Sequence, residues 1–298
     1  MEIHILGTSS MRPTKERGHS ANLFIHNGKH ILIDCGENTQ RQLRIANIPV
    51  TKVSTILITH FHGDHVLGLP GLLQSMRVDM YHGTLHIYGP RGSKNFIRNI
   101  FHAFVMKGDA FGIEVHEIVK DGLIYKDDEL SIFSKRVAHT APCLAYSIVE
   151  NDRRRIDVKK AQALNIPQGP LLGKLQKGSS IKLEGKTIKP DAVSYVVKGR
   201  KFTILTDLSY DKSLKSFAKG SDVLVCEATY LKDLEHLAKE RHHLTAEQAA
   251  KIAKESKVKR LVLTHFSQRY RTADDHLKEA KKIFHDVETA NDFTRVDM

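Results

Sequence analysis

The sequence predicts an α/β (α+β) fold in which two sheets pack against each other and helices cover their outer faces. Short apolar runs of strand length recur along most of the 298 residues, and segments with helical periodicity lie between many of them. Two early strands, at residues 21 to 26 and 29 to 34, are so close in sequence that a hairpin with antiparallel pairing is expected. Because helices are interspersed among the strands, we expect two packed sheets with helices outside.

The elements can be placed in chain order. Residues 1 to 105 are expected to contain strands at residues 2 to 6, 21 to 26, 29 to 34 and 85 to 88, helices at 37 to 46, 67 to 78 and 94 to 105, and an apolar run of buried-strand length at 55 to 59. The rest of the chain is expected to contain strands at 113 to 119, 130 to 138, 144 to 149, 192 to 198, 201 to 206, 222 to 226 and 260 to 264, and helices at 245 to 256 and 274 to 284. Thr245 and Gln248 predict a capping box at the start of the helix at 245 to 256.

Residues 60 to 65, which follow the apolar run at 55 to 59, are the most informative segment. They read His60-Phe61-His62-Gly63-Asp64-His65. Imidazole nitrogen and carboxylate oxygen suit zinc, whereas magnesium and calcium prefer an all-oxygen set and copper redox sites usually include sulfur. A histidine-rich surface loop is the alternative. The position at the end of a core strand favours a metal site, because α/β folds place their sites there.

Three more strands are followed by a residue that can bind metal. The run at 133 to 138 precedes His139, the run at 202 to 206 precedes Asp207, and the run at 261 to 264 precedes His265. Together with the loop, they give seven candidates: His60, His62, Asp64, His65, His139, Asp207 and His265. Seven ligands are too many for one tetrahedral ion and enough for two. Asp207, a lone aspartate at a strand end, is the natural residue to bridge them.

Composition narrows the class of protein. Lys and Arg number 46 against 34 Asp and Glu, so the formal net charge is +12, which attracts polyanions. No apolar run is long enough to span a membrane, and the N-terminus enters a strand pattern with no signal-peptide core, so we expect a cytoplasmic protein with no membrane association. Cys35, Cys143 and Cys226 are odd in number and lie in apolar stretches, which favours reduced core thiols.

Residues 151 to 190 interrupt the alternation of strands and helices. The segment is basic, contains several Gly and Pro residues, and shows no clear core strand. An insertion this long within a compact domain is usually functional or disordered. We therefore expect a basic arm, with a flexible loop that has no partner as the alternative.

Several short segments resemble the metallo-β-lactamase superfamily and, within it, the tRNase Z (ribonuclease Z) family. The loop at 60 to 65 alone indicates the superfamily, and its continuation Gly68-Leu69-Pro70-Gly71-Leu72-Leu73 together with residues 243 to 250 indicates tRNase Z. Further similar segments lie at residues 6 to 10, 13 to 17, 34 to 40, 138 to 140 and 227 to 229. The resemblance runs from residue 3 to about residue 270.

This resemblance implies a single metallo-β-lactamase domain over residues 1 to 298, an αββα four-layer sandwich with its metal site at one edge between the sheets. Residues 151 to 190 would be the inserted flexible arm, the exosite that binds the body of the tRNA. The family's arm has a Gly-Pro tip, which Gly169 and Pro170 resemble, with Lys174 and Lys177 and the more distant Lys159 and Lys160 beside it.

The resemblance also implies two zinc ions per subunit. His60, His62 and His139 would hold one ion, Asp64, His65 and His265 the other, and Asp207 would bridge the pair. Two ions that share a water can lower its pKa towards about 7 and stabilise both oxygens of an in-line phosphoryl transfer. The nucleophile is then hydroxide, and Asp64 either accepts its remaining proton or serves as a ligand only.

The leaving group, a ribose 3′ oxygen, needs a proton. His243 is the candidate acid by its place in the family segment, although its neighbour His242 competes. Glu227 ends an apolar strand and could orient His243, with a salt-bridged surface carboxylate as the alternative.

The implied enzyme is a zinc phosphodiesterase that cuts the 3′ trailer from precursor tRNA, commonly as a homodimer. A small-molecule hydrolase of the same superfamily would share the site but does not need a basic arm. A non-catalytic RNA-binding module would not need seven ligands. A β-CASP nuclease would need a large domain between His139 and Asp207, and the spacing is too short for one.

Overall fold

The computed structural model describes residues 1–106 and 111–298. The chain forms two compact units. The first comprises Met1–Tyr125, Ile132–Ile148 and Lys201–Met298, and the second comprises Lys126–Ser131 and Val149–Arg200. None of the described helices is long and apolar enough to cross a membrane.

The first sheet combines an antiparallel half with a parallel half. Its strand order is β20-β1-β3-β4-β5-β6-β7. The strands are β1 (Glu2–Gly7), β3 (Ala21–His26), β4 (Lys29–Ile33), β5 (Val53–Leu57), β6 (Thr84–Pro90), β7 (Gly112–Ile118) and β20 (Thr294–Asp297). The predicted hairpin is confirmed, because β3 and β4 pair antiparallel. From β4 to β7 the pairing is parallel, so the carboxyl ends of these strands lie at one edge.

The second sheet has the order β19-β17-β16-β15-β10-β9-β8. Its strands are β8 (Gly122–Lys126), β9 (Leu130–Val137), β10 (Cys143–Glu150), β15 (Lys201–Leu205), β16 (Val223–Glu227), β17 (Arg260–Thr264) and β19 (Val287–Thr289). Strands β15, β16, β17 and β19 pair in parallel. A short parallel pair joins β2 (Ser9–Ser10) to β18 (Phe266–Ser267), which directly follows the predicted ligand His265 in sequence.

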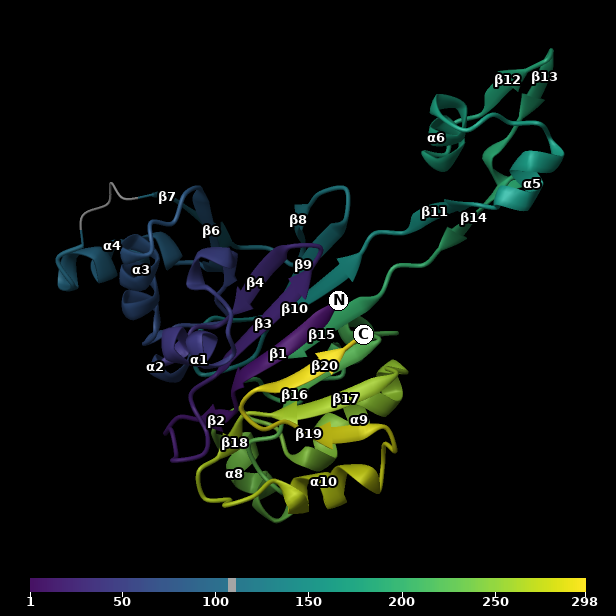
Figure 1. The fold of residues 1–298 in the computed structure, drawn as a ribbon. Helices are drawn as coiled ribbons and strands as arrows, with labels where there is room; N and C mark the ends of the chain where they lie inside the picture. The colour runs from purple at the N-terminus through teal and green to yellow at the C-terminus, as the bar shows by residue number, and fades with distance from the viewer. Residues whose placement is uncertain (107–110) are drawn as a thin grey trace. The chain divides into compact units, whose positions relative to one another are not determined.

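Helices cover the outer face of each sheet in the first unit (Figure 1). Near the first sheet lie α1 (Thr39–Ile45), α2 (Gly63–Val66), α3 (Leu69–Val78) and α4 (Ser93–Ala103), and near the second lie α8 (Glu235–Glu240), α9 (Ala246–Ser256) and α10 (Asp274–Lys281). Helix α7 (Leu214–Ala218) contributes Leu214 and Ala218 to the apolar cluster of the second sheet. Each layer of helices shares a separate apolar cluster with its sheet. Between the sheets, the rings of Phe24 and Phe202 stack with centroids 5.7 Å apart. The αββα four-layer arrangement is therefore present.

Helix α9 begins as the sequence predicts. The Thr245 side chain accepts from the Gln248 backbone N–H, and the Gln248 side chain accepts from the Thr245 backbone N–H. The capping box is confirmed.

The second unit is a small folded body. Strands β11 (Arg153–Ile156) and β14 (Ser194–Val197) form an antiparallel ladder. Beyond it lie α5 (Val158–Ala163), α6 (Pro170–Gln176) and a hairpin of β12 (Ile181–Leu183) and β13 (Lys186–Ile188). These elements enclose a cluster of Ala161, Ile166, Leu175, Ile181 and Val193. The strands β11, β12 and β13 are mostly exposed or half-buried, in keeping with the absence of a clear core strand from this part of the sequence. The folding of the segment into a small body was not expected, because the apolar residues of its cluster are too widely spaced in the sequence to stand out as one run.

Candidate metal centre

The loop after β5 is held in place by close backbone approaches at two glycines. A Cβ on Gly68 would lie 2.0 Å from the Gly36 carbonyl oxygen, and a Cβ on Gly36 would lie 2.5 Å from the Asp64 carbonyl oxygen. Neither distance is possible for a real Cβ, so both positions require glycine. The segment that carries His60 to His65 therefore packs directly against the loop after β4.

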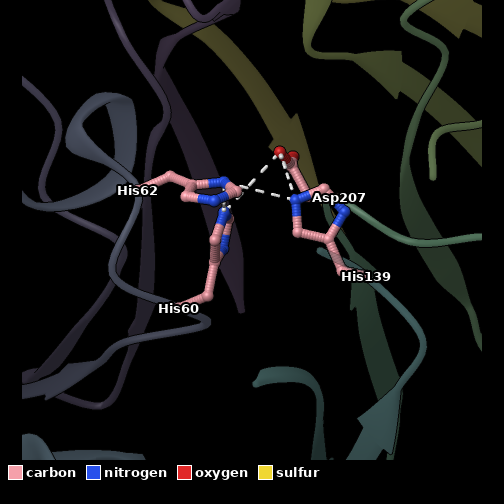
Figure 2. Close-up of side chains that lie close together, drawn as sticks. All are labelled: His60, His62, His139 and Asp207. Atoms are coloured by element: carbon pink, nitrogen blue, oxygen red, sulfur yellow. Dashed lines mark hydrogen bonds and ion pairs between the residues drawn. The ribbon is translucent and has the colours of Figure 1, made fainter. Parts of the chain in front are cut away.

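A first group of predicted ligands converges from three strand ends (Figure 2). It contains His60, His62, His139 and Asp207, each of which offers one ligand atom within 4.8 Å of the others. His60 Nε2 lies 2.9 Å from His62 Nδ1, and His139 Nε2 lies 3.3 Å from the same atom. Asp207 Oδ2 is 3.7 Å from His60 Nε2 and 3.8 Å from His139 Nε2.

A second group lies on the other oxygen of Asp207. It contains Asp64, His65, Asp207 and His265, all buried. Asp207 Oδ1 is 3.4 Å from His65 Nε2 and 3.1 Å from His265 Nε2. Asp64 Oδ2 is 3.4 Å from each of these two nitrogens. The structure thus brings all seven predicted ligands together, with Asp207 as the residue that the two groups share.

The donor atoms fit divalent metal ions. Two of them, His65 Nε2 and Asp207 Oδ1, are buried and have no hydrogen-bond partner among the described residues. Polar atoms without partners are costly to bury, so such atoms call for a ligand. The separations of 3.1 to 3.8 Å between the Asp207 oxygens and the histidine nitrogens are close to the separation of about 3.3 Å between ligands at roughly 2.0 Å from a tetrahedral ion.

The electrostatics of the cluster also favour a cation. Burial lowers the pKa of His60 to about 2, and the neighbouring His65 adds to this, so His60 is a neutral imidazole able to bind metal. Burial would raise the pKa of Asp64, but His65 and His265 outweigh it and hold that pKa well below its usual range. Burial would lower the pKa of His65, but the carboxylates around it raise it well above its usual value. Surroundings that favour a proton on His65 favour a metal cation in its place.

Asp34 supports the cluster from behind. Its Oδ2 lies 2.7 Å from His65 Nδ1, and its Oδ1 accepts from the Thr59 backbone N–H at 2.8 Å. Asp34 thus contacts a predicted ligand from the side opposite the two groups. A carboxylate on Nδ1 fixes the ring so that Nε2 points into the second group.

His243 and Glu227 form a pair beside the two groups. His243 Nδ1 lies 3.1 and 3.2 Å from the two Glu227 oxygens, and His243 Nε2 lies 4.0 Å from Asp207 Oδ2. Burial lowers the pKa of His243, but Glu227 and Asp207 outweigh it and raise the pKa to about 9. Glu227 is fully buried, so the alternative of a surface salt bridge is wrong.

His242 is the alternative to His243 as the candidate acid, and its ring contacts Ser209. Its ring nitrogen Nδ1 lies 2.7 Å from Ser209 Oγ, and its backbone carbonyl oxygen lies 3.0 Å from His139 Nδ1. His242 therefore orients a predicted ligand through its main chain, which sequence reasoning did not find because a carbonyl group leaves no signal in the residue type.

Two further interactions were missed from the sequence. Thr229 Oγ1 donates to Glu227 Oε2 at 2.6 Å and lies 3.2 Å from His265 Nδ1, so it connects the two sides of the site. The sequence feature that could have pointed to Thr229 is the Glu-Ala-Thr segment at 227 to 229. The backbone N–H of Met11 donates to Asp64 Oδ2 at 2.9 Å, a hydrogen bond that no side chain announces.

The predicted arm residues lie in the second unit. Gly169 has a φ of 122° and precedes Pro170, the first residue of α6. Lys174 and Lys177, near the end of this helix, are exposed. The lysines are thus available to a partner in solution.

Comparisons with known proteins agree with this geometry. The family model described as Beta-lactamase superfamily domain matches residues 174–266, and the one described as Anti-Pycsar protein Apyc1 matches residues 1–104. The solved human tRNase Z, short form, is 28% identical with a TM-score of 0.74, and the match covers 100% of this chain and 99% of that one.

Relatives in other organisms are more similar in sequence. Ribonuclease Z of Archaeoglobus fulgidus is 38% identical over 301 residues, which cover 100% of this chain and 97% of the relative. Ribonuclease Z of Bacillus cereus is 37% identical over 300 residues, which cover 98% of this chain and 97% of the relative. The chain therefore belongs to the ribonuclease Z family.

Proposed function

We propose that the chain is a zinc-dependent endoribonuclease that removes the 3′ trailer from precursor tRNA. It leaves a 3′-hydroxyl on the tRNA and a 5′-phosphate on the trailer. Membership of the ribonuclease Z family supports the reaction. The observation that carries the proposal is the convergence of seven ligand residues into two groups that share Asp207.

The proposed metal is zinc, with two ions per subunit. The residues that would hold them are His60, His62 and His139 for one ion, Asp64, His65 and His265 for the other, and Asp207 for both. When bound, two such ions supply an activated water at neutral pH and stabilise charge on a phosphoryl group. The mixture of imidazole and carboxylate donors supports zinc over magnesium or calcium.

His243 is the proposed acid. Its Nδ1 faces the buried Glu227, which leaves Nε2 as the nitrogen directed towards Asp207 and the ligand groups. A proton on Nε2 can therefore be given to the ribose 3′ oxygen as it leaves. The raised pKa of His243 keeps that proton in place at neutral pH.

Glu227 positions His243 and does not contact the substrate. It also accepts hydrogen bonds from the Leu208 backbone N–H at 2.9 Å and from Thr229 Oγ1 at 2.6 Å. A carboxylate fixed by such donors can hold the imidazole ring in one orientation and stabilise its charge.

Asp64 has two possible roles. Its Oδ2 accepts from the Met11 backbone N–H and faces His65 and His265. These interactions support a ligand role, and the same oxygen could accept a proton from the attacking water. An Asp64→Asn variant with full metal content and lost hydrolysis would favour the second role.

The second unit is the proposed exosite. Residues 157 to 193 carry seven lysines and three acidic residues, Asp157, Glu184 and Asp191, a net charge of +4 (7 − 3). Lysines contribute to RNA affinity mainly by neutralising phosphates. Gly169, Pro170, Lys174 and Lys177 are the residues that we expect to contact the tRNA body.

We further propose that the enzyme is a homodimer that acts in the cytoplasm on its precursor tRNA. Exposed apolar side chains on or next to α1 and α3, namely Ile45, Leu67, Val78 and Met80, support a protein interface. Sedimentation at several concentrations would distinguish a dimer from a monomer.

The experiment that tests the function is cleavage of a 3′-extended tRNA with chemical mapping of both new ends. We expect a 3′-hydroxyl on the tRNA and a 5′-phosphate on the trailer, and loss of cleavage after chelation of metal. Products with a 2′,3′-cyclic phosphate would overturn the proposed chemistry, since they require attack by the ribose. Hydrolysis of small phosphodiesters without any cleavage of the tRNA would favour a small-molecule phosphodiesterase.

A further inference from the structure

A second cluster of metal-binding residues lies on the strands β6 and β7, away from the residues around Asp207. These strands pair in parallel, with His86 opposite Glu114 and Tyr88 opposite His116. Because side chains alternate along a strand, these four residues share one face of the sheet. On the opposite face, Leu85 and Ile87 belong to the apolar cluster that packs under the helices.

The ligand atoms of three of these residues converge. His86 Nδ1 lies 3.4 Å from Glu114 Oε2, and His116 Nε2 lies 3.7 Å from the same oxygen. All three ligand atoms lie within 4.8 Å of one another. His116 Nε2 is buried and lacks a hydrogen-bond partner among the described residues. This nitrogen is therefore directed at a place where a ligand would satisfy it.

We propose that His86, Glu114 and His116 bind a divalent transition-metal ion of the zinc class. Two imidazoles and one carboxylate form a common three-residue set for zinc, and the separations of 3.4 and 3.7 Å from Glu114 Oε2 are close to the distance of about 3.3 Å between ligands in a tetrahedral site. A fourth position would be open to water, because the side chains of His86, Glu114 and His116 are 39%, 59% and 41% exposed.

The surroundings hold one of the ligands in place. The Tyr88 ring stacks on the His116 ring with centroids 4.4 Å apart and an angle of 17°. A ligand with a fixed orientation loses less conformational entropy when it binds metal. Lys94 adds a positive charge near His116, which the Glu114 carboxylate offsets.

The ion would connect two strands. In the part of the chain that the structure describes, β7 is the last strand of its sheet and pairs with β6. A metal held by His86 on one strand and Glu114 and His116 on the other would link the edge strand to its neighbour. Its binding free energy would then add to the stability of that edge.

The test is calorimetric titration, with zinc chloride, of enzyme that already holds two zinc ions per chain. We expect the wild type to take up one additional equivalent. Loss of a residue that merely supports a ligand costs roughly 10–100-fold in affinity, so His116→Gln, which removes a ligand, should weaken this binding by at least about 100-fold. Glu114→Gln, at a more exposed position, should do the same, whereas the control His102→Gln on α4 should bind like the wild type.

Hydrolysis of bis(p-nitrophenyl) phosphate separates this site from the active centre, and we expect it to be unchanged in all three variants. Circular dichroism would show whether each variant is folded, and Glu114→Gln keeps the test valid if His116→Gln is not. Equal uptake of additional zinc by the wild type, His116→Gln and Glu114→Gln would overturn the proposal. Absence of additional uptake by the wild type would overturn it as well.

Discussion

At the level of single residues, the buried carboxylates of the site lie next to histidines that can offset their charge. Asp34, Asp64 and Asp207 are almost fully buried, with exposures of 0%, 4% and 3%, and they face His65. Buried carboxylates are stable only when paired with positive charge or bound to metal. The same reasoning assigns different roles to two adjacent histidines. His243 faces a carboxylate and holds a proton, whereas the backbone of His242 orients His139.

The role of His243 can be tested by the dependence on the leaving group. We expect His243→Ala to retain its metal and slow the cleavage of precursor tRNA by roughly 10²–10⁴-fold. A nitrophenolate leaving group needs no proton, so hydrolysis of bis(p-nitrophenyl) phosphate should be much less affected. The control is His242→Ala, in which the carbonyl group that orients His139 is retained.

Glu227→Gln is the companion variant for a positioning role. It should lower the pKa of His243 and shift the alkaline limb of the tRNA cleavage profile to lower pH. Equal losses on both substrates in His243→Ala, or an unchanged profile in Glu227→Gln, would contradict the assignment.

His276 makes a separate prediction for stability. It is fully buried, and its ring packs edge-on against Phe266 and Tyr270. Burial lowers its pKa from 6.5 to about 4, and Arg17 adds to this. As the pH falls below about 6.5, the unfolded chain binds a proton before the folded one does. The stability that the neutral ring contributes is therefore present above this pH and lost as the pH falls towards about 4.

Between pH 7 and pH 5 the wild type should lose about 2 kcal/mol of its free energy of unfolding because of His276, and His276→Leu should not show this loss. Urea unfolding of chelator-treated protein at the two pH values measures the difference. The exposed His102→Leu serves as the control and should follow the wild type. If His276→Leu loses as much stability between pH 7 and pH 5 as the wild type does, His276 is not neutral in the folded state.

At the level of elements, the site depends on where strands end. Strands β5, β9, β15 and β17 each place a proposed ligand within a few residues of their carboxyl ends, and β16 ends at Glu227. This arrangement could be predicted from the sequence, because each ligand follows an apolar run. The elements that are short or lack such a run, such as β8, β19, β20, α7 and α8, were not predicted, since their burial depends on packing against distant parts of the chain.

Most of the second unit, residues 157 to 193, could be removed as one segment. Ile156 and Ser194 are paired residues of the antiparallel ladder, so a short Gly-Ser turn can replace residues 157 to 193. We expect metal content and hydrolysis of bis(p-nitrophenyl) phosphate to persist, while affinity for precursor tRNA falls. The salt dependence should also flatten, because each duplex phosphate that the protein neutralises changes log K by about 0.9 per log unit of salt.

A matched control keeps the unit and changes only its charge. Lys174→Gln with Lys177→Gln should lower tRNA affinity, whereas Lys281→Gln with Lys282→Gln on the first unit should have little effect. Unchanged affinity and salt slope in the replacement variant would rule out an exosite in this unit.

At the level of the whole molecule, features set by local sequence patterns could be predicted, and features set by contacts between distant parts of the chain could not. Local patterns revealed most of the longer strands, the capping box and the seven ligand candidates. The backbone hydrogen bonds of Met11 and His242 depend on loops that meet only in the folded chain, so no residue type indicates them. The folded state of the second unit also escaped prediction, because its cluster joins residues as far apart as Ala161 and Val193.

The central claim is that two metal ions share Asp207 and that hydrolysis depends on them. It is tested by metal content from mass spectrometry together with cleavage of a 3′-extended tRNA. Both are measured for Asp207→Ala and for its parent, in a His116→Gln background that excludes metal bound at His86, Glu114 and His116. The parent should hold two zinc ions per chain and cut the tRNA, and Asp207→Ala should lose metal and cleavage while remaining folded. Full cleavage by Asp207→Ala, or by a parent that holds no metal, would contradict the account.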